Sequence, residues 1–173
     1  QLVAAKEQDK QSRTPFIFGL IAFERNYVGL RHYVQVRLSE AQPEQKRLVA
    51  YLAIAHKYCQ MSVSAPAFAD LLGISRSIAI NLPKALNAEL LDLIILSDTG
   101  KWRTVHPLVA EEVLVQVLSA GASDPRIWKQ NLSNWLKDFI FFCRGLLTQP
   151  TEEGFQLAKR AFIYRENVEL IGT

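Results

Sequence analysis

Residues 91–106 restrict the fold of this chain more than any other stretch, because the hydrophobic period changes there from helical to strand-like. LDLIIL and KWRTVH are short apolar or alternating runs, and the residues between them, SDTG, are typical of a turn. Two such runs joined through Asp-Thr-Gly predict a β-hairpin. A hairpin of two strands is marginally stable alone, so this one has to pack against neighbouring helices.

Helical patterns precede the hairpin. Apolar side chains recur every three or four residues along three stretches, residues 15–38, 43–58 and 64–73. Gly19, Gly29 and the Arg25-Asn26 pair are expected to split the first stretch into two short helices. Pro43 fits the first turn of the second stretch, while Ser64 caps the third and Gly73 ends it.

The helix nearest the hairpin is expected at residues 81–90, because Pro83 is tolerated only in the first turn of a helix. Helices 43–58, 64–73 and 81–90, followed by the hairpin, have the order of a winged-helix domain. The helices before and after it flank this domain. The predicted fold class is therefore mainly α, with a winged-helix domain of three helices plus a β-hairpin.

Three further helices are expected after the hairpin. Pro107 begins one that reaches Leu118 and ends before a glycine, and Asp124 with Pro125 marks the start of a second. Thr151 caps a third. The second of them has a strong apolar stripe with Trp128, Trp135 and Phe139, and the third places Phe155 and Phe162 inside.

The composition excludes several classes of protein. The chain has 173 residues and a formal net charge of +3, and no apolar run approaches the roughly 18 to 20 residues that cross a bilayer. Its polar start is not a secretory signal. Cys59 and Cys143 lie in helical patterns without a CxxC pair, so we expect free thiols in a reducing compartment and no zinc site. The only methionine is Met61, and the missing initiator Met indicates a segment of a longer protein.

The sequence carries no catalytic motif. GxxxxGKS/T, GxSxG and HExxH are all missing. Glu111 and Glu112 lie about 100° apart on the predicted helix, so they do not form a facing acid–base pair. We therefore expect a non-catalytic chain that holds no metal.

Two alternatives follow from the fold class. Winged helices often place their third helix in the DNA major groove, so one alternative is a transcription regulator whose DNA contacts are Arg76, Lys84, Lys101 and Arg103. These scattered cations reach only a few phosphates, whereas groove readers usually concentrate more charge. The other alternative is a protein–protein scaffold, which exposes the aromatic side chains of residues 128–142 as one patch.

His106 differs from the other two histidines in its position. His32 and His56 lie in helical patterns, where a structural role is expected. His106 stands between the second strand and the helix that follows, where free backbone N–H groups and the helix dipole favour an anion such as phosphate. An imidazole N–H can donate to the same anion. The alternative is that His106 only caps its own helix.

A winged helix whose hairpin ends in a histidine, followed by the helix of HPLVAEEVL, resembles the winged-helix domain of the STAND ATPases. These signal-transducing NTPases carry a Met-His-Asp motif at this point, and its histidine contacts the β-phosphate of ADP and holds the inactive state. Val105, His106 and Pro107 stand there in this chain. The resemblance implies that His106 senses the phosphate, with Arg103 and Thr104 in support.

The stretch TPFIFGLIAFE resembles the start of the helical lid in the same family, where a proline lies close to the adenine, and this implies a role for Pro15. The resemblance divides the chain into a tail or linker at 1–13, lid helices at 14–42, a winged-helix domain at 43–120 and the start of a C-terminal helical array at 121–173. ADP or ATP is then shared with an upstream ATPase core of the same protein, which is the expected partner.

The resemblance also implies a biological setting. The intact protein is expected to be cytoplasmic, to form a homo-oligomer when it is activated and to make no membrane contact. Bacterial proteins of this kind act in antiphage defence or programmed cell death.

Overall fold

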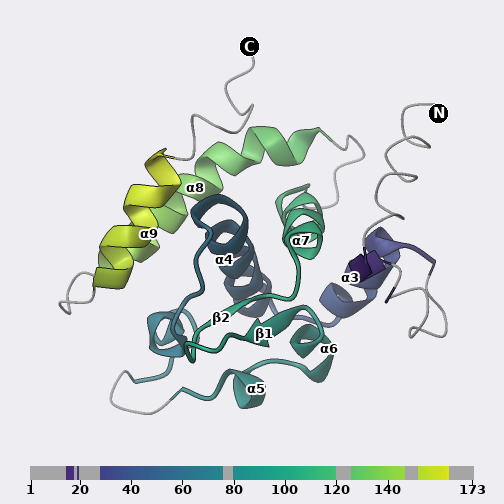
Figure 1. Cartoon of the computed structure of the whole chain (residues 1–173), viewed down its shortest axis with the longest axis horizontal. Helices are drawn as coiled ribbons and strands as arrows, with labels where there is room; N and C mark the ends of the chain where they lie inside the picture. The colour runs from purple at the N-terminus through teal and green to yellow at the C-terminus, as the bar shows by residue number, and fades with distance from the viewer. Residues whose placement is uncertain are drawn as a thin grey trace.

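The computed structural model describes residues 15–17, 19, 28–75, 80–119, 126–146 and 152–163. These residues are mainly helical with two short antiparallel strands, as predicted. The elements are α3 (Leu30–Ser39), α4 (Pro43–Cys59), the 3-10 helix η1 (Ala65–Phe68), α5 (Leu82–Ala85), α6 (Ala88–Leu91), β1 (Ile94–Leu96), β2 (Trp102–Thr104), α7 (Pro107–Ser119), α8 (Ile127–Leu146) and α9 (Glu152–Ile163). In Figure 1, α4 passes through the middle, with α8 and α9 on one side of it and the hairpin on the other.

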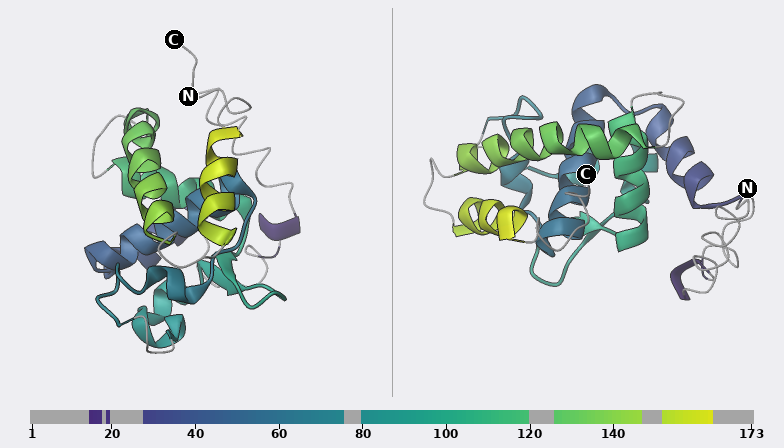
Figure 2. Two further views of the ribbon diagram at one scale, coloured as in Figure 1. Left: turned by 90° about the vertical axis from the view of Figure 1, so that its left-hand side faces the viewer. Right: turned by 90° about the horizontal axis from the view of Figure 1, so that it is seen from above.

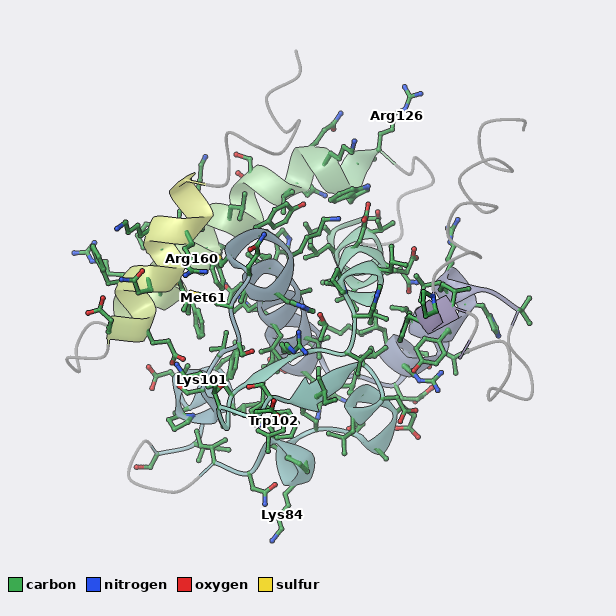
Figure 3. All side chains as sticks on the ribbon, viewed as in Figure 1. Met61, Lys84, Lys101, Trp102, Arg126 and Arg160 are labelled. Carbon is green, nitrogen blue, oxygen red and sulfur yellow. The ribbon has the colours of Figure 1, made fainter. Side chains whose placement is uncertain are left out.

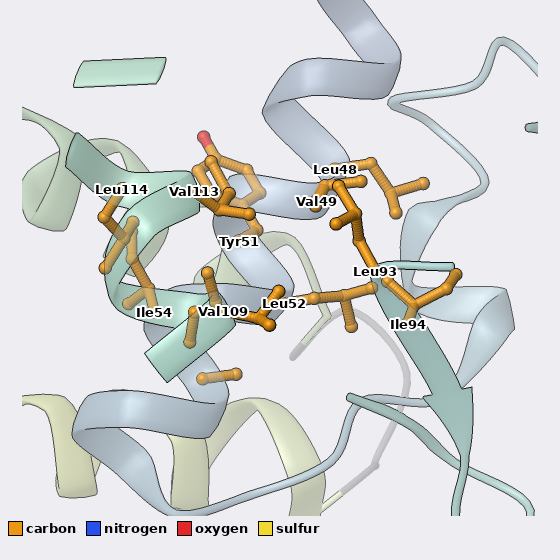
Figure 4. Close-up of a cluster of buried hydrophobic side chains, with 14 of the residues drawn as sticks. Leu48, Val49, Tyr51, Leu52, Ile54, Leu93, Ile94, Val109, Val113 and Leu114 are labelled. Atoms are coloured by element: carbon orange, nitrogen blue, oxygen red, sulfur yellow. The ribbon is translucent and has the colours of Figure 1, made fainter. Parts of the chain in front are cut away.

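Helix α4 forms the centre of the hydrophobic core. Pro43 opens it, and the backbone N–H of Gln42 donates to the side chain of Gln45 (3.1 Å), which satisfies one of the free groups at this end. The helix ends at Cys59, and the next residue, Gln60, has a left-handed backbone with φ 52°. Buried side chains join α4 to α7 and to the hairpin, as Figure 4 shows: Leu48, Val49, Leu52, Ile54, Leu93, Ile94, Val109, Val113 and Leu114.

The predicted hairpin is confirmed. Strands β1 and β2 pair antiparallel with Ile94 opposite Thr104, and Gly100 in the turn has φ 71°, a backbone conformation that glycine adopts without strain. On its other side, β2 exchanges two backbone hydrogen bonds of 2.8 Å between Trp102 and Val63, in the segment after α4. The second strand is thereby fixed on both edges to the helical body.

The single helix predicted for residues 81–90 is wrong, because the structure has two four-residue helices there, α5 and α6. Between them Leu86 is extended, with φ −111° and ψ 154°. The side chain of Asn87 stabilises this break, since it donates to the carbonyl oxygen of Glu40 (3.0 Å) and accepts from the amide of Gln45 (3.2 Å). Contacts with residues far away in the sequence therefore outweigh the local helical period.

Residues 64–73, predicted as an α-helix, form only η1 and a series of turns. Gly73 has the left-handed backbone expected of a helix-ending glycine, with φ 64°, but it closes the turns, because η1 already ends at Phe68. Ser64 does not cap this segment: its hydroxyl and its backbone N–H both donate to the carboxylate of Glu153 on α9. The segment is thus held by a helix that lies far along the chain.

Of the other predicted boundaries, Gly19 is not seen as a break, since its own backbone is helical. Gly29 has φ 140° and α3 begins at the next residue, so the predicted split there is confirmed. Pro107 begins α7 as predicted. The predicted boundaries at Gly121, at 124–125 and at Thr151 lie outside the described residues.

Helices α8 and α9 lie side by side across α4 (Figure 2) and share its core. Trp128 and Phe139 of α8 and Leu157 of α9 are buried, whereas Phe141 is 66% exposed. Cys59 and Cys143 are both free and buried. Within the described ranges, no helix is long and apolar enough to cross a membrane.

Candidate functional site

His106 lies at the junction of β2 and α7, directly after the hairpin, and its side chain is partly exposed. Its Nδ1 accepts a hydrogen bond from the backbone N–H of Leu108 (3.2 Å). The ring therefore caps its own helix, as the structural alternative predicted. Because Nδ1 is an acceptor here, the proton of the neutral imidazole sits on Nε2, which has no hydrogen-bond partner among the described residues.

Phe16 covers one face of this imidazole. The two rings are stacked with centroids 4.3 Å apart and planes 2° apart. Pro15, the adjacent residue, is exposed and belongs to the same helical turn. The structure therefore brings together the two segments in which Pro15 and His106 were predicted to act, although they are about 90 residues apart in the sequence.

A second histidine, His56 of α4, lies beside the end of β2. Its Nδ1 is 2.5 Å from the hydroxyl oxygen of Thr104, which is completely buried. Its Nε2 is 3.5 Å from Nη1 of Arg103. A guanidinium only donates, so Nε2 of His56 accepts from Arg103 and Nδ1–H donates to Thr104. We call His56, Arg103, Thr104 and His106 the junction site.

Both histidines of the junction site are uncharged at neutral pH. Burial is the main reason that the pKa of His56 is lowered to about 4, and the nearby charge of Arg103 lowers it further. Burial also lowers the pKa of His106. The guanidinium of Arg103 is therefore the positive charge of the site, and the histidines contribute hydrogen bonds.

The carboxylates of α7 near this site are engaged elsewhere. Glu111 forms an ion pair with Lys57 (2.5 Å), and Glu112 accepts from the amide of Gln116 (2.9 Å). Burial raises the pKa of Glu112. Among the described residues, no group of three or more His, Cys, Asp or Glu side chains is placed to hold a metal ion. What the junction site offers is hydrogen-bond donors for an anion.

Of the four cations predicted to contact DNA, the three that the structure describes do not form one surface that could read a groove. Lys84 projects from α5, a helix of only four residues, and lies away from Lys101 in Figure 3. Lys101 pairs with Glu153 (2.9 Å), whereas Arg103 belongs to the junction site. Arg76 lies outside the described residues.

Sequence reasoning missed His56, to which it gave only a structural role. The residue lies 48 positions before Thr104 and 50 before His106, on an ordinary helical stripe. It lies next to Thr104 and Arg103 only because β2 packs against α4 in the folded chain. The spacing of residues in the sequence carries no signal for this contact.

Comparison of this chain with models of known protein families, with curated proteins and with solved structures found no match.

Proposed function

We propose that this chain is the regulatory winged-helix segment of a signal-transducing STAND-type ATPase. It closes over ADP held by an upstream ATPase core, and His106 donates a hydrogen bond from Nε2 to the phosphate. The single observation that carries this proposal is the placement of His106. One ring nitrogen caps α7, and the other is left to donate at a helix start that favours anions.

The order of the elements supports the winged-helix assignment. Helix α4, the η1 segment and the α5–α6 pair precede the hairpin, and the Val63–Trp102 bridge attaches the hairpin to the segment between the first two helical units. In this assignment the hairpin is the wing. The expected third helix is broken at Leu86, which changes the face that a winged helix usually places in DNA but does not alter the hairpin or the position of His106 after it.

The stacking of Phe16 on His106 supports a role for the segment that carries Pro15. With the lid segment and the end of the wing in contact, one nucleotide can touch both, its adenine beside Pro15 and its phosphates beside His106. Release of this contact on ligand sensing would free the segment to swing away from the core and allow a homo-oligomer to form. Antiphage defence or programmed cell death is the setting that we propose for the intact protein.

The alternative functions have less support. The short α5 and the Lys101–Glu153 ion pair reduce the charge and the helix surface that a DNA groove would need. A scaffold with one large aromatic patch is disfavoured because Trp128 and Phe139 are buried in the shared core. Neither alternative uses the arrangement at His106.

The test uses the intact protein that carries this chain after its ATPase core. His106→Asn keeps an acceptor for the Leu108 N–H but removes the Nε2–H donor, so it separates phosphate binding from helix capping. We expect ADP to dissociate roughly tenfold faster or more, because a hydrogen bond to a charged group contributes about 1.5–3 kcal/mol. Spontaneous activation should rise in parallel.

His32→Asn serves as the control, since His32 is exposed on α3. This variant should release ADP at the wild-type rate. If His106→Asn also retains ADP and stays inactive like the wild type, the phosphate-sensing function is wrong.

A further inference from the structure

Arg103 is an exposed cation at the junction site that no described carboxylate neutralises. Its partner is the uncharged ring of His56, with 3.5 Å between Nη1 and Nε2. The other cations near it are paired: Lys57 with Glu111, and Lys101 with Glu153. A guanidinium that is anchored but keeps its charge is the group best suited to bind a phosphate.

We propose that Arg103 is a second phosphate-binding group of the junction site and that His56 is the residue that positions it. The inference rests on the proposed function, which it deepens: the site would hold a diphosphate through two donors, the His106 imidazole and the Arg103 guanidinium. A diphosphate has oxygens on both phosphorus atoms for these donors, whereas a monophosphate offers one group.

The chemistry of His56 fits this role. A carboxylate at position 56 would hold the guanidinium as well, but it would cancel the charge that attracts an anion. A neutral imidazole accepts one hydrogen bond from Arg103 and leaves the remaining guanidinium N–H groups free to donate. The ring is itself fixed, because Nδ1–H donates to the hydroxyl of Thr104, a completely buried residue of β2. The buried hydroxyl of Thr104 thus fixes the ring of His56, and the ring orients the exposed side chain of Arg103.

His56 and His106 also belong to one local environment. Besides burial, which is the main cause, the charge of Arg103 lowers the pKa of His56, and a proton on His106 would lower it further. Thr104 and His106 are two residues apart at the end of β2, and His56 reaches the same strand from α4. The two proposed phosphate donors therefore come from the same short stretch, residues 103–106.

The experiment is a titration of this 173-residue chain with inorganic pyrophosphate at constant ionic strength, followed by NMR of the imidazole and guanidinium nitrogens. We expect shifts at His106 and Arg103, weaker binding of inorganic phosphate than of pyrophosphate, and an affinity for pyrophosphate that falls roughly tenfold in Arg103→Gln, since one charge-assisted hydrogen bond is lost. Lys137→Gln removes an equal charge from the exposed face of α8 and should leave the affinity unchanged.

Two substitutions at position 56 distinguish positioning from a merely structural role. His56→Gln retains an acceptor near the place of Nε2 and loses the donor to Thr104. His56→Asn retains that donor and loses the acceptor for Arg103. If His56 positions Arg103, the Gln variant keeps pyrophosphate affinity and the Asn variant loses it. If the ring only supports Thr104, the effects are reversed and the positioning role is overturned.

The outcomes separate this inference from the proposed function. Pyrophosphate binding that is lost in His106→Asn but unchanged in Arg103→Gln overturns the role of Arg103 and leaves the function of His106 intact. Pyrophosphate binding that needs both residues, in a protein whose ADP release does not respond to His106→Asn, supports the two-donor anion site and overturns the nucleotide role. A chain that shows no site-specific shift with pyrophosphate contradicts the inference.

Discussion

Lys101 directly precedes β2 and Arg103 lies within it, yet the two side chains have opposite electrostatic surroundings. Lys101 forms an ion pair of 2.9 Å with Glu153 of α9, whose side chain is only 9% exposed. Arg103 lies against a neutral histidine and has no carboxylate partner in the described part of the chain. The first charge joins a distant helix to the hairpin, and the second is left available.

The partners explain the difference. Glu153 also accepts from the hydroxyl and the backbone N–H of Ser64, so one carboxylate connects α9, the hairpin and the segment after α4. His56 holds Arg103 through one hydrogen bond and leaves its charge in place. A charge that is matched by a nearly buried partner stabilises the fold, whereas a charge that is held but not matched is a candidate for binding.

The largest effect is expected when the contacts of Glu153 with Lys101 and Ser64 are removed. Glu153→Ala removes the acceptor for Ser64 and Lys101 together, and we expect the free energy of unfolding to fall by about 2–3 kcal/mol, as is usual when several buried hydrogen bonds to a charged group are lost. Urea unfolding followed by circular dichroism measures this loss. Glu152→Ala, on the exposed side of the same turn, should cost about 0.5 kcal/mol or less. Equal losses in the two variants would contradict the linking role of Glu153.

The next largest effect concerns His56, the partner of Arg103, and depends on pH. The pKa of His56 is about 4 in the folded protein against 6.5 for a free imidazole. Between these values the unfolded chain binds more protons than the folded one, so stability is fully present above pH 6.5 and is lost as the pH falls towards 4. We expect a loss of about 2 kcal/mol, because water still screens this half-buried ring.

His56→Gln gives the comparison for the pH effect. The variant lacks the titrating group but keeps an acceptor towards Arg103, so the difference in unfolding free energy between wild type and variant should narrow as the pH falls from 6.5 to 4. Parallel curves across this range would mean that His56 titrates normally in the folded chain. Equilibrium urea unfolding at successive pH values provides the measurement.

Much of the fold could be predicted from the sequence because it depends on local signals. The change of period at residues 91–106 predicted the hairpin, and Pro107 and Gly29 marked real helix boundaries. The errors arose where distant residues decide the local backbone. Asn87 is bonded to Glu40 and Gln45, which breaks the third predicted helix, and Ser64 is engaged by α9 instead of capping its own segment.

The site was predicted less completely than the fold, for the same physical reason. His106 could be singled out because it stands between a strand and a proline, which is a local signal. The partners of His56 could not be predicted, since nothing in the sequence around it indicates that α4 packs against the end of β2. The opposite environments of Lys101 and Arg103 could not be predicted from the sequence either, because Glu153, the partner of Lys101, lies about 50 residues away.

The smallest expected effect is the most direct test of the contrast between the two cations. Arg103→Gln should change the free energy of unfolding by no more than about 0.5 kcal/mol, because an exposed charge without a carboxylate partner contributes little to stability. Lys101→Gln should cost more, about 1 kcal/mol, since it leaves the nearly buried carboxylate of Glu153 without its cation. Thermal and urea unfolding of the two variants, side by side at low salt, give this difference. A larger loss of unfolding free energy for Arg103→Gln than for Lys101→Gln would mean that Arg103 is a structural residue. The contrast between a cation that stabilises the fold and one that is available for binding would then be wrong.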